Sequence, residues 1–168
     1  MPGDSNQHLE TVEIERAGYE RKSTLRNLVE LYLYDLSVFE EEESDVNECG
    51  LYEYEYLDHY WTEPGREAFL IRVNGKLAGF ALVLTTPEHH SMEEFFVMRR
   101  YRGRRIGQRA AHQLFDLLPG RWRIAEMRLD TPAQNFWRKV ISRYHQVRFV
   151  EGIDPTWAGP VQEFSTRD

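Results

Sequence analysis

The sequence predicts an α/β fold in which one β-sheet is covered by helices on both faces. Residues 67–73 and 76–85 are apolar, strand-like runs joined by Asn74-Gly75, a strong signal for a tight hairpin turn. The remaining strand-like and helical segments follow the order β α α β β β α β α β β. Such mixed hairpins, with helices between them, favour a single sheet that packs against helices on each side.

The elements of the N-terminal half are assigned from apolar periodicity. Residues 11–17 alternate apolar and polar and predict a strand. Residues 23–39 carry an apolar stripe with helical spacing and predict a helix, with Ser23 or Thr24 as its N-cap. Residues 51–61 fit a short helix or an alternating strand, and we favour the helix.

The C-terminal half continues with strands and helices in alternation. The expected strands cover residues 91–98, 121–129, 145–152 and 159–166. The expected helices cover residues 105–118, stopped by Pro119-Gly120, and residues 131–144. We expect Thr131 to cap the second of these helices and Pro132 to be its first residue.

Length and composition bound the class of protein. A chain of 168 residues with 41% hydrophobic residues fits a single domain over residues 1–168. No apolar run approaches the roughly 18 residues that span a membrane, and the first residues lack the pattern of a secretory signal. The single cysteine, Cys49, offers neither an internal disulfide nor a zinc site. We therefore expect a cytoplasmic protein without a metal and without a membrane partner.

Charge is distributed unevenly along the chain, whose formal net charge is -7. Residues 1–95 carry 7 Lys or Arg against 21 Asp or Glu, whereas residues 96–148 carry 13 against 3. Residues 99–109 alone contain six arginines, and we call them the arginine cluster. The cluster is compatible with a nucleic-acid patch, a solvated helix face or a cradle for a phosphate-bearing ligand. The acidic half would repel nucleic acid, so we expect no nucleic-acid partner.

The position of the arginine cluster favours the phosphate cradle. An apolar strand runs into a glycine-containing basic loop and then into a helix. The first N–H groups of a helix have no intrahelical partner, and the helix dipole is positive at that end. Glycine lets the backbone approach an anion closely, and arginine adds charge and forked donors. This order of elements predicts an anion-binding loop.

The segment YRGRRIGQRAAHQLF, preceded by EEFFV, resembles the acyl-CoA motif of the GCN5-related N-acetyltransferases, the GNAT superfamily. The motif Gln/Arg-x-x-Gly-x-Gly/Ala falls on residues 102–107, where Arg102 and Gly107 match and Arg105 replaces the middle glycine. The segment DTPAQNFW is similar to a second family pattern, Asn-x-x-Ala-x-x-x-Tyr, with Ala133 matching outright and Trp137 in the tyrosine position. The hairpin of residues 69–83 also resembles the family's second and third strands, and the order of elements agrees over nearly the whole chain. One branch of uncharacterised predicted acetyltransferases is similar in detail.

The resemblance implies a GNAT-like fold, with a mixed, mostly antiparallel sheet whose middle strands splay apart. It also implies that acetyl-CoA is the acyl donor and that no metal takes part. The strand before the loop would hold the pantetheine arm through its backbone, and the loop amides would hold the pyrophosphate. The implied binding residues are Phe96, Val97, Met98, Arg102, Gly103, Arg104, Arg105, Ile106, Gly107, Gln108, Ala133 and Trp137.

The chemistry that the family implies is direct attack by a primary amine on the thioester. Glu93 and Glu94 are the candidate general bases, and because neighbouring strand residues point to opposite faces, only one of them can face the cleft. The general acid would protonate the leaving thiolate. Trp137 stands in the family's tyrosine position, but an indole is no practical proton donor. The candidates for the acid are therefore Tyr144, Tyr101 or water.

The acceptor is expected to be a small, cationic amine. Residues 27–65 contain no Lys or Arg but twelve acidic residues, which suits a cation, although a solvated acidic loop would have the same composition. Two other functions remain open: a non-catalytic acyl-CoA-binding sensor of the same fold, and a nucleic-acid-binding module that uses the arginine cluster. A homodimer also remains open.

Overall fold

Seven strands form one sheet in the computed structural model, which describes residues 10–40, 44–157 and 159–167. The order across the sheet is β1-β2-β3-β4-β5-β7-β6, and every neighbouring pair is antiparallel except β4 and β5. The strands are β1 (Val12–Arg16), β2 (Arg66–Val73), β3 (Lys76–Thr85), β4 (His90–Val97), β5 (Arg121–Ala125), β6 (Phe149–Ile153) and β7 (Pro160–Ser165).

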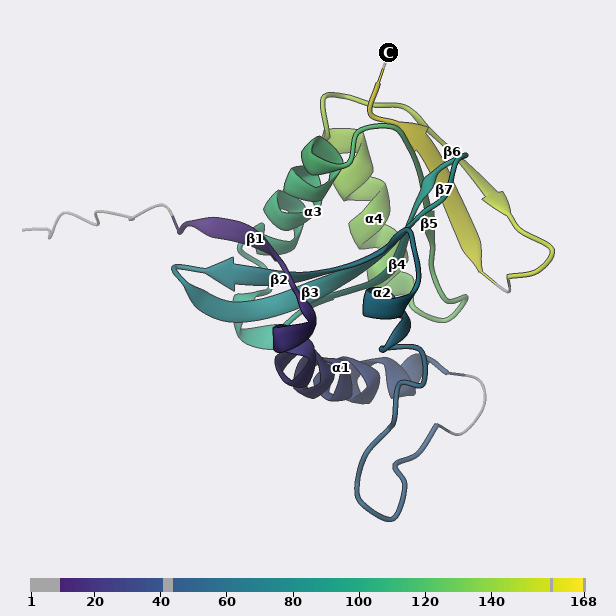
Figure 1. Ribbon diagram of the computed structural model, residues 1–168. Helices are drawn as coiled ribbons and strands as arrows, with labels where there is room; N and C mark the ends of the chain where they lie inside the picture. The colour runs from purple at the N-terminus through teal and green to yellow at the C-terminus, as the bar shows by residue number, and fades with distance from the viewer. Residues whose placement is uncertain (1–9, 41–43, 158, 168) are drawn as a thin grey trace, which may run out of the picture.

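Helices cover both faces of the sheet (Figure 1). One face carries α1 (Lys22–Leu36) and α2 (His59–Thr62), and the other carries α3 (Ile106–Leu117) and α4 (Thr131–Arg143). Short 3₁₀ turns are η1 (Tyr19–Arg21), η2 (Ser37–Phe39) and η3 (Arg99–Tyr101). The predicted fold class, a mostly antiparallel sheet between two helical layers, is confirmed. Within the described residues, no helix is long and apolar enough to cross a membrane.

The core divides at the sheet because strand side chains alternate between its faces. Phe69 and Ala81 pack with Leu114 and Phe115 of α3 and with residues of α4. Their chain neighbours point the other way, so that Leu70 belongs to the cluster beneath α1. The central strands β2 and β3 therefore read as nearly continuous apolar runs because both of their faces are covered.

The middle of the sheet splays open. β4 pairs with β5 only over His90–Met92, and residues 93–97 have no partner on β5. The register of β4 against β3 shifts between Leu82 and Val83, which leaves Glu93 as an extra, bulged residue. The unpaired half of β4 therefore has a free edge that faces the N-terminal ends of α3 and α4 (Figure 1).

Two predictions in the N-terminal half are wrong. The expected helix over residues 51–61 is reduced to α2, because residues 51–58 form an irregular, turn-rich segment whose backbone N–H groups at Tyr52 and Glu53 bond to the Glu30 carboxylate of α1. Neither Ser23 nor Thr24 caps α1. The η1 turn runs directly into Lys22, and its Tyr19 carbonyl accepts the hydrogen bond of the Lys22 backbone N–H.

Three boundaries in the C-terminal half also differ from expectation. Asp130, not Thr131, caps α4 by accepting a hydrogen bond from the backbone N–H of Ala133 at 2.9 Å. β5 ends at Ala125 because residues 127–130 turn the chain toward α4. β6 begins at Phe149, since His145 and Gln146 adopt positive φ angles that a strand cannot contain.

Candidate active site

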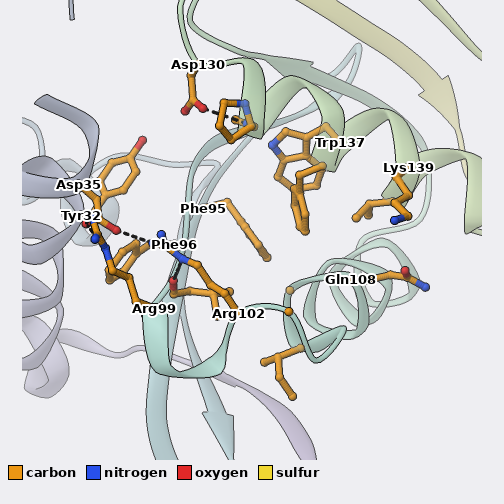
Figure 2. A pocket seen from close by; sticks show the side chains of 18 of the residues that line it. Tyr32, Asp35, Phe95, Phe96, Arg99, Arg102, Gln108, Asp130, Trp137 and Lys139 are labelled. Carbon is orange, nitrogen blue, oxygen red and sulfur yellow. Dashed lines mark hydrogen bonds and ion pairs between the residues drawn. The ribbon is translucent and has the colours of Figure 1, made fainter. Parts of the chain in front are cut away.

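A cavity of about 550 Å³ lies between α1, β4, the loop before α3, and α4 (Figure 2). Of the binding residues implied by the sequence, all except Met98 and Arg104 line it. Met98 packs instead in the core beneath α1, and Arg104 forms an ion pair with Glu10. The lining residues that were expected are Phe96, Val97, Arg102, Gly103, Arg105, Ile106, Gly107, Gln108, Ala133 and Trp137.

The free edge of β4 presents backbone hydrogen-bonding groups to the open side. Met98 donates its N–H to Ala78 of β3 at 2.8 Å. Because N–H groups alternate in direction along a strand, those of Phe95 and Val97 point away from β3. The carbonyl of Val97 already accepts a hydrogen bond from Nε of Arg102 at 2.7 Å, which leaves the groups of Phe95 and the N–H of Val97 for a ligand.

The first turn of α3 is an uncapped helix N-terminus at the cavity wall. Residues 106–108 open the helix, and no side chain in the described part of the protein accepts hydrogen bonds from their backbone N–H groups. Gly107 allows close packing, since a Cβ there would lie 3.1 Å from the Phe136 ring of α4. The helix thus begins close to α4 with three N–H groups and a positive dipole end available for an anion.

Arg105 stands where the family motif has its middle glycine, and its backbone explains that glycine. Its φ is 58°, in the left-handed region, at the N-cap of α3. A residue with a Cβ pays about 1–2 kcal/mol for this conformation. The loop therefore keeps the shape that the motif describes, and the Arg105 side chain is exposed at the cavity rim.

Asp35 of α1 holds two members of the arginine cluster. Its carboxylate pairs with Arg99 at 2.8 Å and with Arg102 at 2.5 Å, and these partners keep its pKa below the ordinary value although burial opposes them. Arg102 also bonds to the backbone of β4. These two arginines therefore join the loop to α1 and are not free to bind a ligand phosphate without giving up that contact.

Two further arginines of the cluster bind the segment before β1. Arg104 pairs with the Glu10 carboxylate at 2.5 Å, and Arg109 donates to the Glu10 backbone carbonyl at 2.6 Å. Three of the six arginines thus pair with two carboxylates, and Arg109 bonds to a backbone carbonyl, so four of the six are held by partners within the chain. This pairing does not support the interpretation of the cluster as a free polyanion patch.

Sequence reasoning missed the cations that α4 contributes. Lys139 and Arg143 line the cavity, and Arg143 donates to the Gln108 side chain at 3.2 Å, beside the first turn of α3. Their spacing from Phe136, three and seven residues along a helix, could have indicated that they share its face. They add positive charge to the end of the cavity at which α3 begins, beside that of Arg105 in the loop.

Glu94 is not among the cavity-lining residues, but it borders the cavity through its hydrogen bond with Tyr32, which does line it. Glu94 is half-buried on the unpaired half of β4 and accepts hydrogen bonds from the hydroxyls of Tyr32 on α1 and of Tyr54, the latter at 3.1 Å. Burial raises the pKa of Glu94 to about 7, with the two hydroxyls acting in the opposite direction and Glu93 adding to the rise. A carboxyl with this pKa can accept a proton near neutral pH.

The other predicted catalytic residues lie elsewhere. The Glu93 side chain is exposed at the bulge, and partial desolvation raises the pKa of its carboxyl. Tyr144 donates its hydroxyl to Asp116 of α3 at 2.7 Å, and burial together with that carboxylate raises its pKa to about 12. Tyr144 packs in the core between α3 and α4 and is not among the cavity-lining residues, so it is not placed to act there.

The residues around the cavity fit acetyl-CoA. The cavity offers an apolar floor at Phe95 and Phe136, free backbone groups on β4, uncapped amides at α3, and cations at Lys139 and Arg143. The apolar floor and the β4 backbone groups suit an acyl-pantetheine arm. The α3 amides and the two cations suit a group of phosphates. The described residues contain no group of three or more His, Cys, Asp or Glu side chains placed to hold a metal ion.

Several acetyltransferases are among the solved structures of similar fold. The PaiA N-acetyltransferase of Thermoplasma acidophilum, in complex with coenzyme A, superposes with a TM-score of 0.67 at 13% identity, covering 92% of this chain and 99% of that one. The aminoglycoside acetyltransferase AAC(6')-Ib, also with coenzyme A, has a TM-score of 0.65 at 12% identity, covering 94% and 95%. The ribosomal-protein-S18-alanine N-acetyltransferase of Escherichia coli has a TM-score of 0.60 at 11% identity, covering 92% of each chain. The fold is therefore that of acetyltransferases.

The sequence itself places the chain in a family. The profile of the Acetyltransferase (GNAT) family matches residues 30–141, and this chain belongs to that family. Its cosubstrate is acetyl-CoA, as the coenzyme A complexes of its fold neighbours illustrate. A comparison with curated proteins finds no match.

Proposed function

We propose that the protein transfers the acetyl group of acetyl-CoA to a primary amine of a small, cationic acceptor, with Glu94 as the general base. The observation that carries this proposal is the Glu94 carboxyl, which is half-buried beside the splayed strands, has a pKa of about 7 and is oriented by two tyrosine hydroxyls. Several fold neighbours are named N-acetyltransferases, which supports a nitrogen acceptor.

The binding of acetyl-CoA is assigned to residues on three elements. The β4 edge at Phe95 and Val97 would bond the pantetheine arm, and the N-terminal amides of α3 would hold the pyrophosphate. Arg105, Lys139 and Arg143 would neutralise the remaining phosphate charge. The apolar floor excludes water from the arm and strengthens these interactions.

Glu94 accounts for the proton that the amine must lose. The neutral amine nitrogen attacks the thioester carbonyl carbon, the C–N bond forms and the C–S bond breaks. Glu94, as the carboxylate, accepts the proton from nitrogen directly or through one water. Because a base acts only when deprotonated, the rate should rise with pH through about 7, where Glu94 titrates.

The acidic side of the molecule supports a cationic acceptor. The segment of residues 27–65 has no Lys or Arg, and it supplies both Tyr32 and Tyr54 to the site. Acceptor cations would therefore approach through a negative field. The homodimer and the cytoplasmic location remain predictions from the sequence.

The test is a screen of amines with acetyl-CoA in which release of the free thiol is measured, first for the wild-type protein. Diamines, polyamines and aminoglycosides should be acetylated faster than neutral or acidic amines of similar size. Glu94→Gln should then lower kcat by about 10²- to 10⁴-fold, because the amide cannot accept the proton.

Glu93→Gln is the matched control, since it removes an exposed carboxylate from the same strand. It should lower kcat by less than about fivefold, because it changes only the electrostatic field near Glu94. Equal losses in the two variants would contradict the assignment of Glu94. Binding of coenzyme A without thiol release for any amine would instead favour the non-catalytic sensor.

A further inference from the structure

The lining of the cavity includes one residue with a phenolic hydroxyl, Tyr32. Tyr32 lines the cavity from α1, across Phe95 from Trp137 (Figure 2). Its ring is held by Phe80, in an edge-on contact with centroids 5.7 Å apart, and by Phe96 at 5.8 Å. The hydroxyl is therefore fixed in place, and it donates its hydrogen bond to Glu94.

The other polar groups of the cavity are not available as acids at this place. Asp35 is held as a carboxylate by its two arginines. Asp130 accepts the hydrogen bond that caps α4. Lys139 lies one helical turn before Arg143, and Arg143 bonds to Gln108 at the start of α3. Lys139 therefore belongs to the α3 end of the cavity. Trp137, in the position of the family's tyrosine, carries no acidic proton.

We propose that Tyr32 is the general acid of the reaction and that Glu94 returns its proton to it, so that the two residues form a relay from nitrogen to sulfur. The inference rests on the proposed acetyl transfer. It assigns to α1 a role for which the sequence offered Tyr144, Tyr101 or water.

The proton balance of the relay closes. The acceptor ammonium first loses a proton to solvent, and the neutral amine attacks the thioester. As the C–N bond forms, Glu94 accepts a proton from nitrogen. As the C–S bond breaks, Tyr32 gives its proton to sulfur, and Glu94 passes its own proton to the Tyr32 oxygen along their existing hydrogen bond. The products are the amide and the thiol, and both side chains return to their starting states.

Tyr54 provides the matched comparison. It also donates to Glu94, but it is not among the cavity-lining residues. Tyr32→Phe and Tyr54→Phe each remove one hydrogen bond from the Glu94 carboxylate, so both should raise the pKa of Glu94. Only Tyr32→Phe also removes a hydroxyl from a residue that lines the cavity. The other titratable groups near this pair are the same in both variants: Glu93 on β4 and Tyr60 on α2 act on Glu94, and Asp130 before α4 acts on Tyr32.

The experiment measures the single-turnover rate of acetyl transfer against pH for wild type and both variants, with the best amine from the screen. Both variants should move the rising limb to higher pH. At the plateau above that limb, Tyr32→Phe should remain about 10²-fold slower than wild type. Tyr54→Phe should be slower by no more than about threefold.

Two measurements do not depend on turnover. The Glu94 pKa, followed by carboxyl ¹³C NMR in the protein without ligand, should rise in both variants, and the Kd for coenzyme A should stay within about twofold of wild type. Equal plateaus for the two variants would overturn the relay and leave the proposed function standing. Absence of thiol release by the wild-type protein would overturn the proposed function, and the relay with it.

Discussion

At the scale of single residues, Arg105 shows how a motif can change while its geometry persists. The family motif has glycine where this chain bends into the left-handed region, and the arginine accepts the same backbone conformation at φ 58°. The substitution adds a cation at the cavity rim at the expense of backbone strain. The two effects are separable, because glycine removes both the charge and the strain, whereas alanine removes the charge alone.

We therefore expect Arg105→Gly and Arg105→Ala to weaken coenzyme A binding to a similar extent, about 3- to 10-fold. The glycine variant should be more stable than the alanine variant by about 1 kcal/mol, since only alanine retains the unfavourable positive φ. Calorimetric titration gives the affinities, and urea unfolding gives the stabilities. A stability difference near zero would show that position 105 carries no strain.

Elsewhere at this scale, partners decide what a charged residue does. Arg99 and Arg102 share Asp35, and Arg104 pairs with Glu10, so these residues shape the loop instead of presenting free charge. Their carboxylate partners lie more than 60 positions away in the sequence. The number of arginines in this stretch of sequence therefore overstates the charge that the cluster has free for a ligand.

At the scale of elements, α4 is both a wall of the cavity and a source of charge. Asp130 fixes its first turn, and Phe136 packs against the start of α3. The same face then carries Lys139 and Arg143 to the phosphate end of the cavity. One helix thus positions the apolar floor and the cations together.

Lys139→Gln and Arg143→Gln should each raise the KM for acetyl-CoA by about 3- to 10-fold, with kcat changed much less, because phosphate binding is equal in ground and transition states. Arg148→Gln is a charge-matched control on an exposed residue that is not among the cavity-lining residues, and it should leave KM within about twofold of wild type. Steady-state kinetics against acetyl-CoA concentration separates these outcomes. A similar rise in KM in the control would point to general charge steering instead.

The segment before α2 illustrates the opposite situation, in which an element is lost to tertiary contacts. Residues 51–61 have the composition of a short helix, yet most of them are irregular. Tyr52 and Glu53 bond through their backbone to Glu30 of α1, and Tyr54 reaches Glu94 on β4. An irregular path allows the segment to meet two elements at once, which a helix of this length would not.

At the scale of the whole molecule, a second buried carboxyl couples stability to pH. Glu126, just after β5, is 4% exposed, and both of its carboxyl oxygens are without a hydrogen-bond partner in the described part of the chain. Gln162 lies beside it but donates its amide to Glu151 at 2.9 Å. Burial raises the pKa of Glu126 to about 8, with the Gln162 side chain and Arg138 opposing the rise and Glu151 and Asp130 adding to it.

A carboxyl whose pKa is raised from 4.5 to about 8 holds its proton in the folded state while the unfolded chain loses it. The free energy of unfolding should therefore fall as pH rises through that window. Glu126→Gln removes the titration and places an amide donor beside the unpartnered oxygen of Gln162.

We expect Glu126→Gln to change stability little at pH 5 and to raise it by on the order of 1–3 kcal/mol at pH 9. Urea unfolding of wild type and variant at both pH values measures the difference in their free energies of unfolding. The titration of all other groups is the same in both proteins and cancels in this difference. An identical pH dependence in the two proteins would contradict a buried, unpartnered Glu126.

The order of nearly all the elements, the Asn74-Gly75 hairpin and the family's loop motif could be predicted from the sequence, because hydrophobic periodicity, turn residues and the loop motif are local properties. The sequence also reduced the choice of general base to two adjacent glutamates, but it could not choose between them.

Only the tertiary structure decided which groups act together. Glu94 meets Tyr32 and Tyr54 across 62 and 40 positions of sequence. The bulge at Glu93 and the early end of the β4–β5 pairing expose that meeting point beside the cavity. Such contacts depend on how strands and helices pack, and packing is set by the whole core rather than by any one segment. For that reason the loop motif could be identified from residues 102–107, whereas the contact between Glu94 and Tyr32, on which the proposed relay rests, could not.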